Sequence, residues 1–411
     1  MNAFPETFGN APILFAHSPK WEYRRDRDDP HTARYIPARM LTSLRPGKDF
    51  IILPGNSESV REFAKFCTAI LGIERRQILY TSGTNYQIAT DARIELVETL
   101  SRLVPQESAI LPYAPTPSTV RLAQALGLRL IGENESWLRR FGTKAVLHRS
   151  AIPEKRPRGL PHIVDPNIPT PRGYLAVDRE ELALAQKKLS DAGVKRMLLK
   201  PVSGSSGEGI REVVACSDLS SYLFDLGPVV LEERLEIDRV DGAMLSPSIQ
   251  YIGRGLGPVS DQVMDGHSHT GNRYPSHATL EQQAALADAA GRLVDWMRPV
   301  GPGGFDAVIS GGKPYIVDVN AGRCTAAHPA LFFRSRYAPQ ALCEVWKPKP
   351  NMSVFDIWHQ LRRKGLAFMP GKDEWGVFPL YWLRGMKAQL IALGGSAEEM
   401  RVLREGTEAL L

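Results

Sequence analysis

The sequence predicts an α/β protein that begins with a Rossmann-like parallel sheet and continues into α+β segments. Two observations carry this prediction. Short apolar runs alternate with segments of helical periodicity over the first third of the chain, which is typical of a doubly wound parallel sheet. Further on, two strand pairs are joined by glycine-rich turns, which indicates antiparallel hairpins.

The first third supplies five strands and three helices. We expect strands at 12–16, 50–54, 77–80, 109–112 and 129–132, and helices at 60–71, 92–103 and 119–126, the last with Ser118 as its N-cap. No G-x-G-x-x-G fingerprint follows any of these strands. This region is therefore not expected to bind a dinucleotide cofactor.

The rest of the chain mixes hairpins with helices. A helical pattern covers 136–151 and contains Lys144, and a proline-rich connector follows at 153–171. We expect strands at 174–177, 197–200, 210–215, 228–231, 246–251, 305–309 and 314–319, helices at 179–192, 219–226 and 280–297, a loop over 253–277, and a C-terminal helix at 354–364, strand pair at 376–391 and closing helix from Ala397.

Composition narrows the class of protein. The 411 residues suggest two to four subdomains, and the net charge of +6 comes from mostly scattered basic residues, which disfavours nucleic-acid binding. There is no apolar run long enough to cross a membrane and no signal-peptide pattern at the first residues. Four widely spaced cysteines without a C-x-x-C pair favour a cytoplasmic protein without disulfides or structural zinc.

The most informative segment is the glycine- and serine-rich loop after Lys200. Its members are Ser203, Gly204, Ser205, Ser206, Gly207 and Gly209. A strand follows this loop, whereas a P-loop or a dinucleotide fingerprint opens a helix. Glycines let backbone N–H groups converge on an anion, and the lysine adds a positive charge. We therefore expect a hairpin flap over phosphates; the alternative is an ordinary surface hairpin.

A second hairpin carries the residues that suit a metal. Asp306, Asp318 and Asn320 fall near one end of paired strands, and their hard oxygen donors suit Mg²⁺ held jointly with phosphates. The alternative is that Asp318 and Asn320 only end a strand. Arg323 offers a planar fork for a carboxylate or phosphoryl group. Glu232 could accept from an adenine amino group.

Two further acids, Asp238 and Asp241, are candidates for ribose contacts, with a solvated acidic turn as the alternative. The histidines at 267, 269 and 277 are expected to be plain loop residues. Cys324 is expected to be a passive small residue.

In this order, Lys144, Lys200, the flap at 203–209, Glu232 and the acidic hairpin resemble the ATP-grasp superfamily. The resemblance covers about residues 136–330, and Asn167-Ile-Pro-Thr-Pro171 is similar to a segment of that family. The preceding region looks like a pre-ATP-grasp domain. The implied domains are 1–135 (pre-ATP-grasp), 136–235 and 236–345 (the two α+β ATP-grasp subdomains) and 346–411 (a C-terminal extension).

The resemblance implies roles for the matching residues. Lys144 and Lys200 would contact the α- and β-phosphates of ATP, and the flap would cover the β- and γ-phosphates. Glu232 and the Leu235 backbone would read adenine. The metal ligands Asp306, Asp318 and Asn320 would hold two Mg²⁺ ions, for which Mn²⁺ could substitute. Asp318 stands where many members have Glu, and the Asn320–Arg323 spacing is longer than in several branches.

The architecture looks most like the pheganomycin-type peptide ligases of natural-product pathways. This implies an ATP-dependent carboxylate–amine ligase that forms an acyl-phosphate and releases ADP and phosphate, with Lys200 and Arg323 as catalytic residues. Its partners would be an amino acid or small acid and an amine, itself an amino acid or peptide; a homodimer is left open. One alternative loads an amino acid on an acyl carrier protein, docked near Arg334 and Arg336. Another is a non-catalytic nucleotide-binding regulator.

Overall fold

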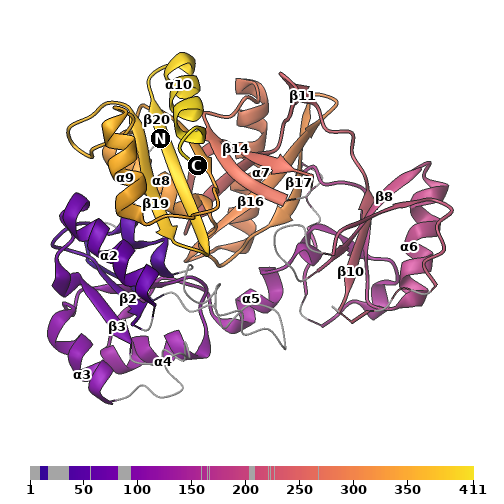
Figure 1. The fold of residues 1–411 in the computed structure, drawn as a ribbon. Coiled ribbons are helices and arrows are strands. Elements are labelled where there is room, and N and C mark those ends of the chain that lie inside the picture. The colour runs from indigo at the N-terminus through magenta and orange to yellow at the C-terminus, as the bar shows by residue number, and fades with distance from the viewer. Residues whose placement is uncertain are drawn as a thin grey trace.

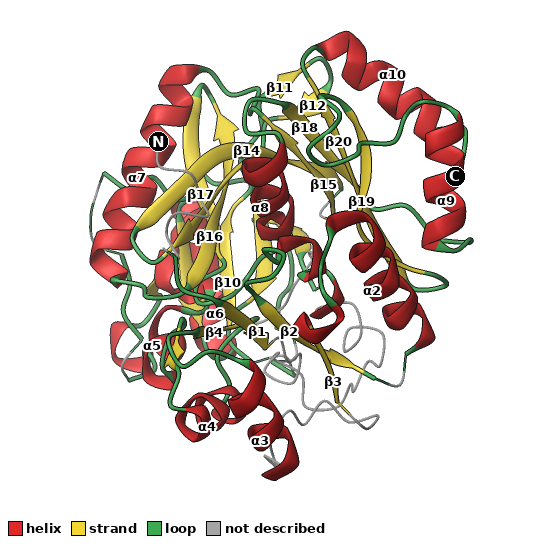
Figure 2. Cartoon of the chain, turned by 90° about the vertical axis from the view of Figure 1, so that its left-hand side faces the viewer, coloured by secondary structure: helices red, strands yellow, loops and turns green. Residues whose placement is uncertain are grey.

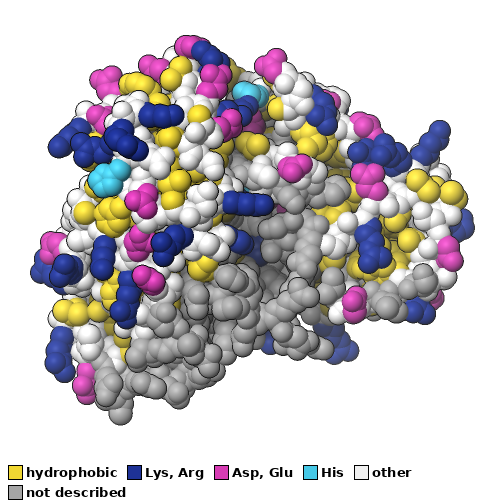
Figure 3. Space-filling view, in the orientation of Figure 1, with side chains coloured by type: hydrophobic (Ala, Val, Ile, Leu, Met, Phe, Trp, Pro, Cys, Tyr) yellow, Lys and Arg dark blue, Asp and Glu magenta, His cyan; other side chains and the backbone are white. Residues whose placement is uncertain are grey.

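The computed structural model describes residues 10–16, 37–55, 57–81, 94–158, 160–163, 165, 167–202, 209–220, 222, 224–225, 227–266 and 268–411. Within them the chain forms three main sheets (Figure 1). No described helix has both the length and the hydropathy that a membrane crossing requires. On the face shown in Figure 3, acidic and basic side chains are interspersed.

The first sheet is parallel, with the strand order β3-β2-β1-β4-β5. It contains β1 (Ile13–Ala16), β2 (Phe50–Pro54), β3 (Ile78–Thr81), β4 (Ala109–Pro112) and β5 (Arg129–Leu130), with α2 (Glu58–Leu71), α3 (Ile94–Leu103), α4 (Pro117–Leu126), η3 (Leu41–Ser43) and η4 (Arg75–Gln77) around it. Ile13 and Phe15 pack into one core cluster and Leu14 and Ala16 into another. Because side chains alternate along a strand, both faces of the sheet are covered. The predicted doubly wound sheet is confirmed.

Helix α4 begins differently from the prediction. Its N-cap is Thr116, whose hydroxyl accepts from the Thr119 backbone N–H, and Pro117 is the first helical residue. Proline suits this position because its missing N–H would have no partner there. The prediction of Ser118 as the cap was wrong.

The second sheet has the order β6-β7-β10-β8-β9 and stands opposite the first sheet in Figure 1. Its elements are β6 (Arg149–Ser150), β7 (Gly173–Ala176), β8 (Arg196–Pro201), β9 (Arg211–Val214), β10 (Val229–Glu233) and α6 (Arg179–Asp191). Strands β8 and β9 are antiparallel, as the sequence predicts. The helix predicted over 219–226 is wrong, since its described residues are irregular.

The single helix predicted over 136–151 is also wrong. The segment divides into α5 (Glu135–Phe141), η5 (Lys144–Leu147) and β6, followed by η6 (Pro153–Lys155). The end of α5 lies at Gly142, where a Cβ would come 2.6 Å from the carbonyl oxygen of Leu138. Lys144 is the first residue of the short 3-10 turn η5.

The third sheet has eight strands in the order β17-β16-β13-β14-β15-β18-β20-β19. These are β13 (Pro247–Ile252), β14 (Gly255–Asp265), β15 (Ser268–Tyr274), β16 (Pro302–Ser310), β17 (Lys313–Val319), β18 (Leu342–Trp346), β19 (Gly376–Leu383) and β20 (Lys387–Gly394); β11 (Arg239–Val240) and β12 (Ala243–Met244) form a separate pair. The loop predicted over 253–277 was therefore wrong, because β14 and β15 form a hairpin there. Strands β19 and β20 of the C-terminal segment belong to the same sheet as the strands of the segment before them.

Helices α7 (Leu280–Met297), α8 (Ala327–Tyr337), α9 (Val354–Arg363) and α10 (Ala397–Glu408) pack against this sheet (Figure 2). The rings of Phe66 on α2 and Phe378 on β19 lie 5.7 Å apart, and Phe333 on α8 stacks on Phe378 at 4.7 Å. The first and last parts of the chain therefore share one core, which fixes the domain of the first sheet against the eight-stranded sheet.

A second contact joins the first sheet to the large one. The Glu133 carboxylate accepts from the backbone N–H groups of Val300 and Gly301, at 2.5 and 2.8 Å. Gly132 and Gly301 approach so closely that a Cβ on Gly301 would lie 2.8 Å from the Gly132 Cα. Only glycine permits this approach without a shift of the backbone.

Candidate active site

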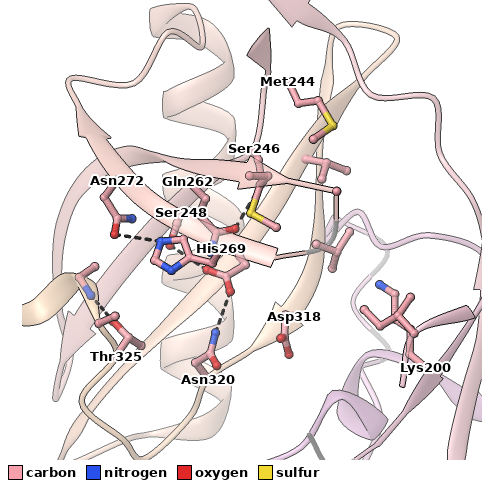
Figure 4. Close-up of a pocket in the computed structure, with 18 of the residues that line it drawn as sticks. Lys200, Met244, Ser246, Ser248, Gln262, His269, Asn272, Asp318, Asn320 and Thr325 are labelled. Atoms are coloured by element: carbon pink, nitrogen blue, oxygen red, sulfur yellow. Dashed lines mark hydrogen bonds between the residues drawn. The ribbon is translucent and has the colours of Figure 1, made fainter. Parts of the chain in front are cut away.

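One cavity of about 870 Å³ brings most of the predicted residues together. Figure 4 shows Lys200 on one side of it, with Asp318 and Asn320 on the other. The predicted residues in its lining are Lys144, Lys200, Glu232, Leu235, Asp306, Asp318, Asn320 and Arg323. They lie on strands of the second and third sheets or on the segments next to them, so the cavity lies between these two parts of the chain.

Lys200 is held in place by a buried carboxylate. Its ammonium lies 2.5 Å from Glu232 Oε1, and the other oxygen of Glu232 lies 3.0 Å from His148 Nε2. Strands β8 and β10 pair antiparallel with Lys200 opposite Val230, which places the lysine close to Glu232 two residues on. Burial raises the pKa of Glu232, but Lys200 and His148 together bring it below its usual value. The carboxylate is therefore charged and shared between two neighbours.

This arrangement gives Glu232 a different place from the expected one. The sequence suggests a side chain that reaches adenine, whereas the structure buries the carboxylate beneath Lys200. The next residues, Glu233, Arg234 and Leu235, line the cavity.

The acidic hairpin forms the opposite wall. Asp306 on β16 pairs directly with Asp318 on β17, just before a bulge in the ladder. The Asp306 carboxylate accepts from the Ser248 hydroxyl and from the Asn320 amide, both at 2.8 Å. Burial and the nearby Asp318 raise the pKa of Asp306 to about 6. Two carboxylates and one amide thus share a single patch of the sheet.

Lys144 bridges the two walls. Its ammonium lies 3.3 Å from Asp318 Oδ2, and the other oxygen of Asp318 accepts from the Val319 N–H. Arg323 donates to Asn320 Oδ1. In the described part of the chain no group of three or more His, Cys, Asp or Glu side chains could hold a metal ion. A cation at the hairpin would need further ligands from a bound molecule.

A chain of hydrogen bonds continues from Asp306 across the sheet. Ser248 accepts from Gln250 Nε2 at 2.7 Å, and Gln250 Oε1 accepts from the Thr325 hydroxyl at 2.7 Å. The Gln250 side chain crosses over Gly304, where a Cβ would come within 2.3 Å of it. These polar residues were not predicted from the sequence. Their signal was the alternation of Ser246, Ser248 and Gln250 along an otherwise apolar strand.

His269 was also missed, because the sequence places it in a loop. It lies on β15 and lines the cavity, and its Nε2 is 3.1 Å from Asn272 Oδ1. His267 lies outside the described residues. Cys324 is buried, and burial raises its pKa to about 12, in line with a passive role.

The flap residues Ser203, Gly204, Ser205, Ser206 and Gly207 lie outside the described residues. Gly209 closes this segment with φ +77°, a conformation that favours glycine, and does not line the cavity. The strands on either side pair with Leu199 opposite Arg211, so the chain reverses direction between them.

The structure does not bring the two candidate ribose acids to the cavity. The Asp238 carboxylate accepts from the N–H groups of Gly311 and Gly312, at 3.0 and 2.8 Å, and so holds the β16–β17 turn. Asp241 lies in the turn between β11 and β12, with φ 48°. Neither residue lines the cavity.

The expected docking face for a carrier protein was wrong. Arg334 is buried, donates to the Ala341 carbonyl and lies 3.7 Å from the Tyr274 ring centroid. Arg336 donates to the carbonyls of Ser43 and Leu44. Both arginines hold the fold together instead of facing a partner.

Two models of known protein families match parts of this chain. Residues 38–128 match the pre ATP-grasp domain, and residues 163–327 match an ATP-grasp domain. A search of curated proteins finds no match.

Among solved structures, biotin carboxylase from Campylobacter jejuni is 12% identical, with a TM-score of 0.57 over 96% of this chain and 91% of that one. N5-carboxyaminoimidazole synthase from Aspergillus clavatus is 10% identical, with a TM-score of 0.57 over 98% and 99%. The biotin carboxylase domain of the Hydrogenobacter thermophilus 2-oxoglutarate carboxylase is 16% identical, with a TM-score of 0.54 over 96% and 89%. At these identities the likeness shows the fold.

The matched models describe a superfamily and not a branch of it, so the peptide-ligase branch stays a prediction. The chain belongs to the ATP-grasp superfamily of ATP-dependent ligases, and a pre-ATP-grasp domain precedes its ATP-grasp domain.

Proposed function

We propose that this protein uses ATP to activate a substrate carboxylate as an acyl-phosphate and then couples it to an amine, releasing ADP and phosphate. The supporting observation is that Lys144 and Lys200 line the same cavity as Asp306, Asp318 and Asn320. Cations that suit phosphates thus face oxygen donors that suit Mg²⁺. A protein that only binds a nucleotide needs no such opposition.

Each wall has a part in holding the nucleotide. Lys200, fixed by Glu232, and Lys144 would contact phosphate oxygens, and the segment at 203–209 would close over them. The backbone of Glu233–Leu235 would bind adenine, since these residues line the cavity beside Lys200. The glutamate would act through the lysine that it positions.

The acidic hairpin fits a magnesium ion by the chemistry of its donors. Asp306, Asp318 and Asn320 offer only hard oxygens, and the phosphates would supply the remaining ligands. Mg²⁺ bound there would offset charge on the transferring phosphoryl group. Lys144 contacts Asp318 and Arg323 donates to Asn320, so two cations lie directly beside this donor set.

The reaction then has two steps. A carboxylate oxygen attacks the γ-phosphorus of ATP. The bond between the γ-phosphorus and the oxygen that bridges it to the β-phosphorus breaks, and ADP leaves. The amine attacks the acyl carbon, the bond to the phosphate oxygen breaks, and the amine loses a proton as phosphate departs. Arg323 lies beside Asn320 and would steady the acyl-phosphate. Closure of the cavity would keep water from the intermediate.

The test is a screen for ADP and phosphate release over carboxylic acids paired with amines, with product masses recorded. A positive acid is then labelled with ¹⁸O on both carboxylate oxygens. Transfer of one ¹⁸O to inorganic phosphate is expected, because an acyl-phosphate leaves a carboxylate oxygen on the phosphorus. Release of AMP and pyrophosphate, or of unlabelled phosphate, would contradict the proposal.

A further inference from the structure

The end of the cavity away from β8 and β10 is strongly basic. Arg39 comes from the first domain, Arg323 follows β17, Lys347 and Lys349 follow β18, and Lys387 begins β20. Among the described residues that these segments contribute to the cavity lining, all those with a charged side chain are basic. Three distant parts of the chain thus converge to build one cationic pole.

Arg39 is the most deeply placed of these cations. The residue is only 5% exposed. Its guanidinium donates to the Cys324 carbonyl, and the central carbon of the guanidinium lies 4.9 Å from the Tyr113 ring centroid. Its Nε has no hydrogen-bond partner, and no described carboxylate forms an ion pair with it. A buried cation without an anion is unfavourable, so this position is suited to receive one.

Lys347 is fixed beside Arg39. Its ammonium donates to His269 Nδ1 and to the His269 carbonyl, both at 2.8 Å, which leaves one of three donors. His269 does not neutralise it, because burial and Lys347 itself lower the pKa of His269 to about 4. Burial, followed by the charges of Lys387 and Arg39, lowers the pKa of Lys347 to about 8. The three cations therefore repel one another.

We propose that Arg39 and Lys347, at this pole, bind a second anionic group of the substrate. The substrate would then be a carboxylic acid that also carries a carboxylate or a phosphate. This inference rests on the proposed function, which places the reacting carboxylate near the acidic hairpin. An anion there would relieve the repulsion between Arg39 and Lys347, and it would accept from Arg39 Nε and from the remaining N–H of Lys347.

The spacing of the two anions is set by the backbone. Arg323 donates to Asn320 beside the acidic hairpin, whereas the next residue, Cys324, holds Arg39 through its carbonyl. One peptide segment therefore connects the group that would steady the reacting carboxylate to the group that would anchor the other end. A substrate with a single anionic group would make no contact with Arg39 and Lys347.

The test compares three probes with the same three-methylene chain: pentanoate, glutarate and 4-phosphonobutyrate. Binding to the full-length enzyme is measured by calorimetry without ATP. We expect at least one of the two dianions to bind about 10-fold or more tightly than pentanoate, the gain of one charged hydrogen bond. The better dianion tells a carboxylate from a phosphate. Equal binding of all three probes would overturn the proposal.

Two variants locate the binding. Lys347→Met should lower dianion affinity about 10-fold and leave pentanoate binding almost unchanged. The exposed Lys364→Met is the control and should match the wild type. Arg39→Gln should have the same effect on the two affinities. If Arg39→Gln does not fold, the result for Lys347→Met decides, because Lys347 is accessible. Wild-type dianion affinity in Lys347→Met would overturn the proposal.

The outcomes separate this inference from the proposed function. If dianions bind through Lys347 but no acid supports ADP release, the anion site stands and the ligase activity falls. If monocarboxylates turn over with a KM that Lys347→Met does not change, the activity stands and the anion site falls.

Discussion

The ammonium of Lys144 lies 3.3 Å from the Asp318 carboxylate, so a candidate phosphate ligand and a candidate metal ligand are paired with each other. Lys144 starts a 3-10 turn in the second domain segment, and Asp318 lies near the end of β17. The pair joins the two walls of the cavity. Mg²⁺ and a triphosphate arriving together would give each residue a partner of opposite charge.

Lys144→Met should raise the KM for ATP about 10-fold, because it removes one charge-assisted hydrogen bond to a phosphate. The effect on stability should be small, since the pair is partly exposed. Steady-state kinetics at saturating acid and amine check this. Lys155→Met, which removes a half-buried lysine paired with Asp178 and Glu180 away from the cavity, is the control. An unchanged KM would remove Lys144 from the nucleotide site.

Lys200→Met should abolish turnover and also destabilise the fold by roughly 3–5 kcal/mol, because it leaves the buried Glu232 carboxylate without its main partner. Adding Glu232→Gln should restore much of the stability and none of the turnover. Urea denaturation and ADP release measure the two effects separately. Exposed Lys195→Met, on the residue before β8, should leave both unchanged. Turnover in the double variant would show that Lys200 is structural.

Gly271→Ala should destabilise the protein by about 1–3 kcal/mol, the usual range for overpacking. Its Cβ would lie 2.0 Å from the Val345 carbonyl, so β15 and β18 would have to separate. Gly291→Ala is the matched control, because nothing lies within 4 Å of that Cβ in α7, and it should stabilise by about 1 kcal/mol. Urea midpoints compare them. Equal midpoints would contradict the tight strand pairing that carries His269.

Affinity for glutarate should be constant near neutral pH, where glutarate is a dianion, and fall as pH rises above 8, by at most about tenfold per unit. The sign follows because the free enzyme holds Lys347 with a pKa of about 8, and a bound anion favours the ammonium. His269 stays neutral through this range, because its pKa is lowered to about 4. Lys347→Arg should remove the dependence, since arginine keeps its charge. A calorimetric pH series checks this, and an identical fall in the arginine variant would contradict it.

The sequence predicted most strands and helices because their periodicity is local. Strands β1, β2 and β4 are short apolar runs, and α7 has a capping box that begins at Thr279. The β14–β15 hairpin was missed because its polar residues face the cavity and so lack the alternation of a half-buried strand. Helix α8 went unrecognised for a similar reason, since it is buried all round.

Some residues of the candidate site could likewise be predicted from the sequence, and others could not. Asp306, Asp318 and Asn320 were found because strand spacing fixes their relative positions. The Glu232–Lys200–His148 contact was not found, because it depends on pairing between strands distant in sequence. The cationic pole was not found either, since Arg39 and Lys347 are 308 positions apart and meet only in the folded chain.

The central claim is that a magnesium nucleotide binds between Lys200 and the acidic hairpin. The most direct measurement is calorimetry of ADP binding to the full-length protein, with Mg²⁺ and with EDTA. Mg²⁺ should strengthen binding about 10-fold or more in the wild type, and Asp318→Asn should remove that gain while ADP still binds weakly. ADP binding that is equally tight with EDTA, or a full Mg²⁺ gain in Asp318→Asn, would contradict the claim.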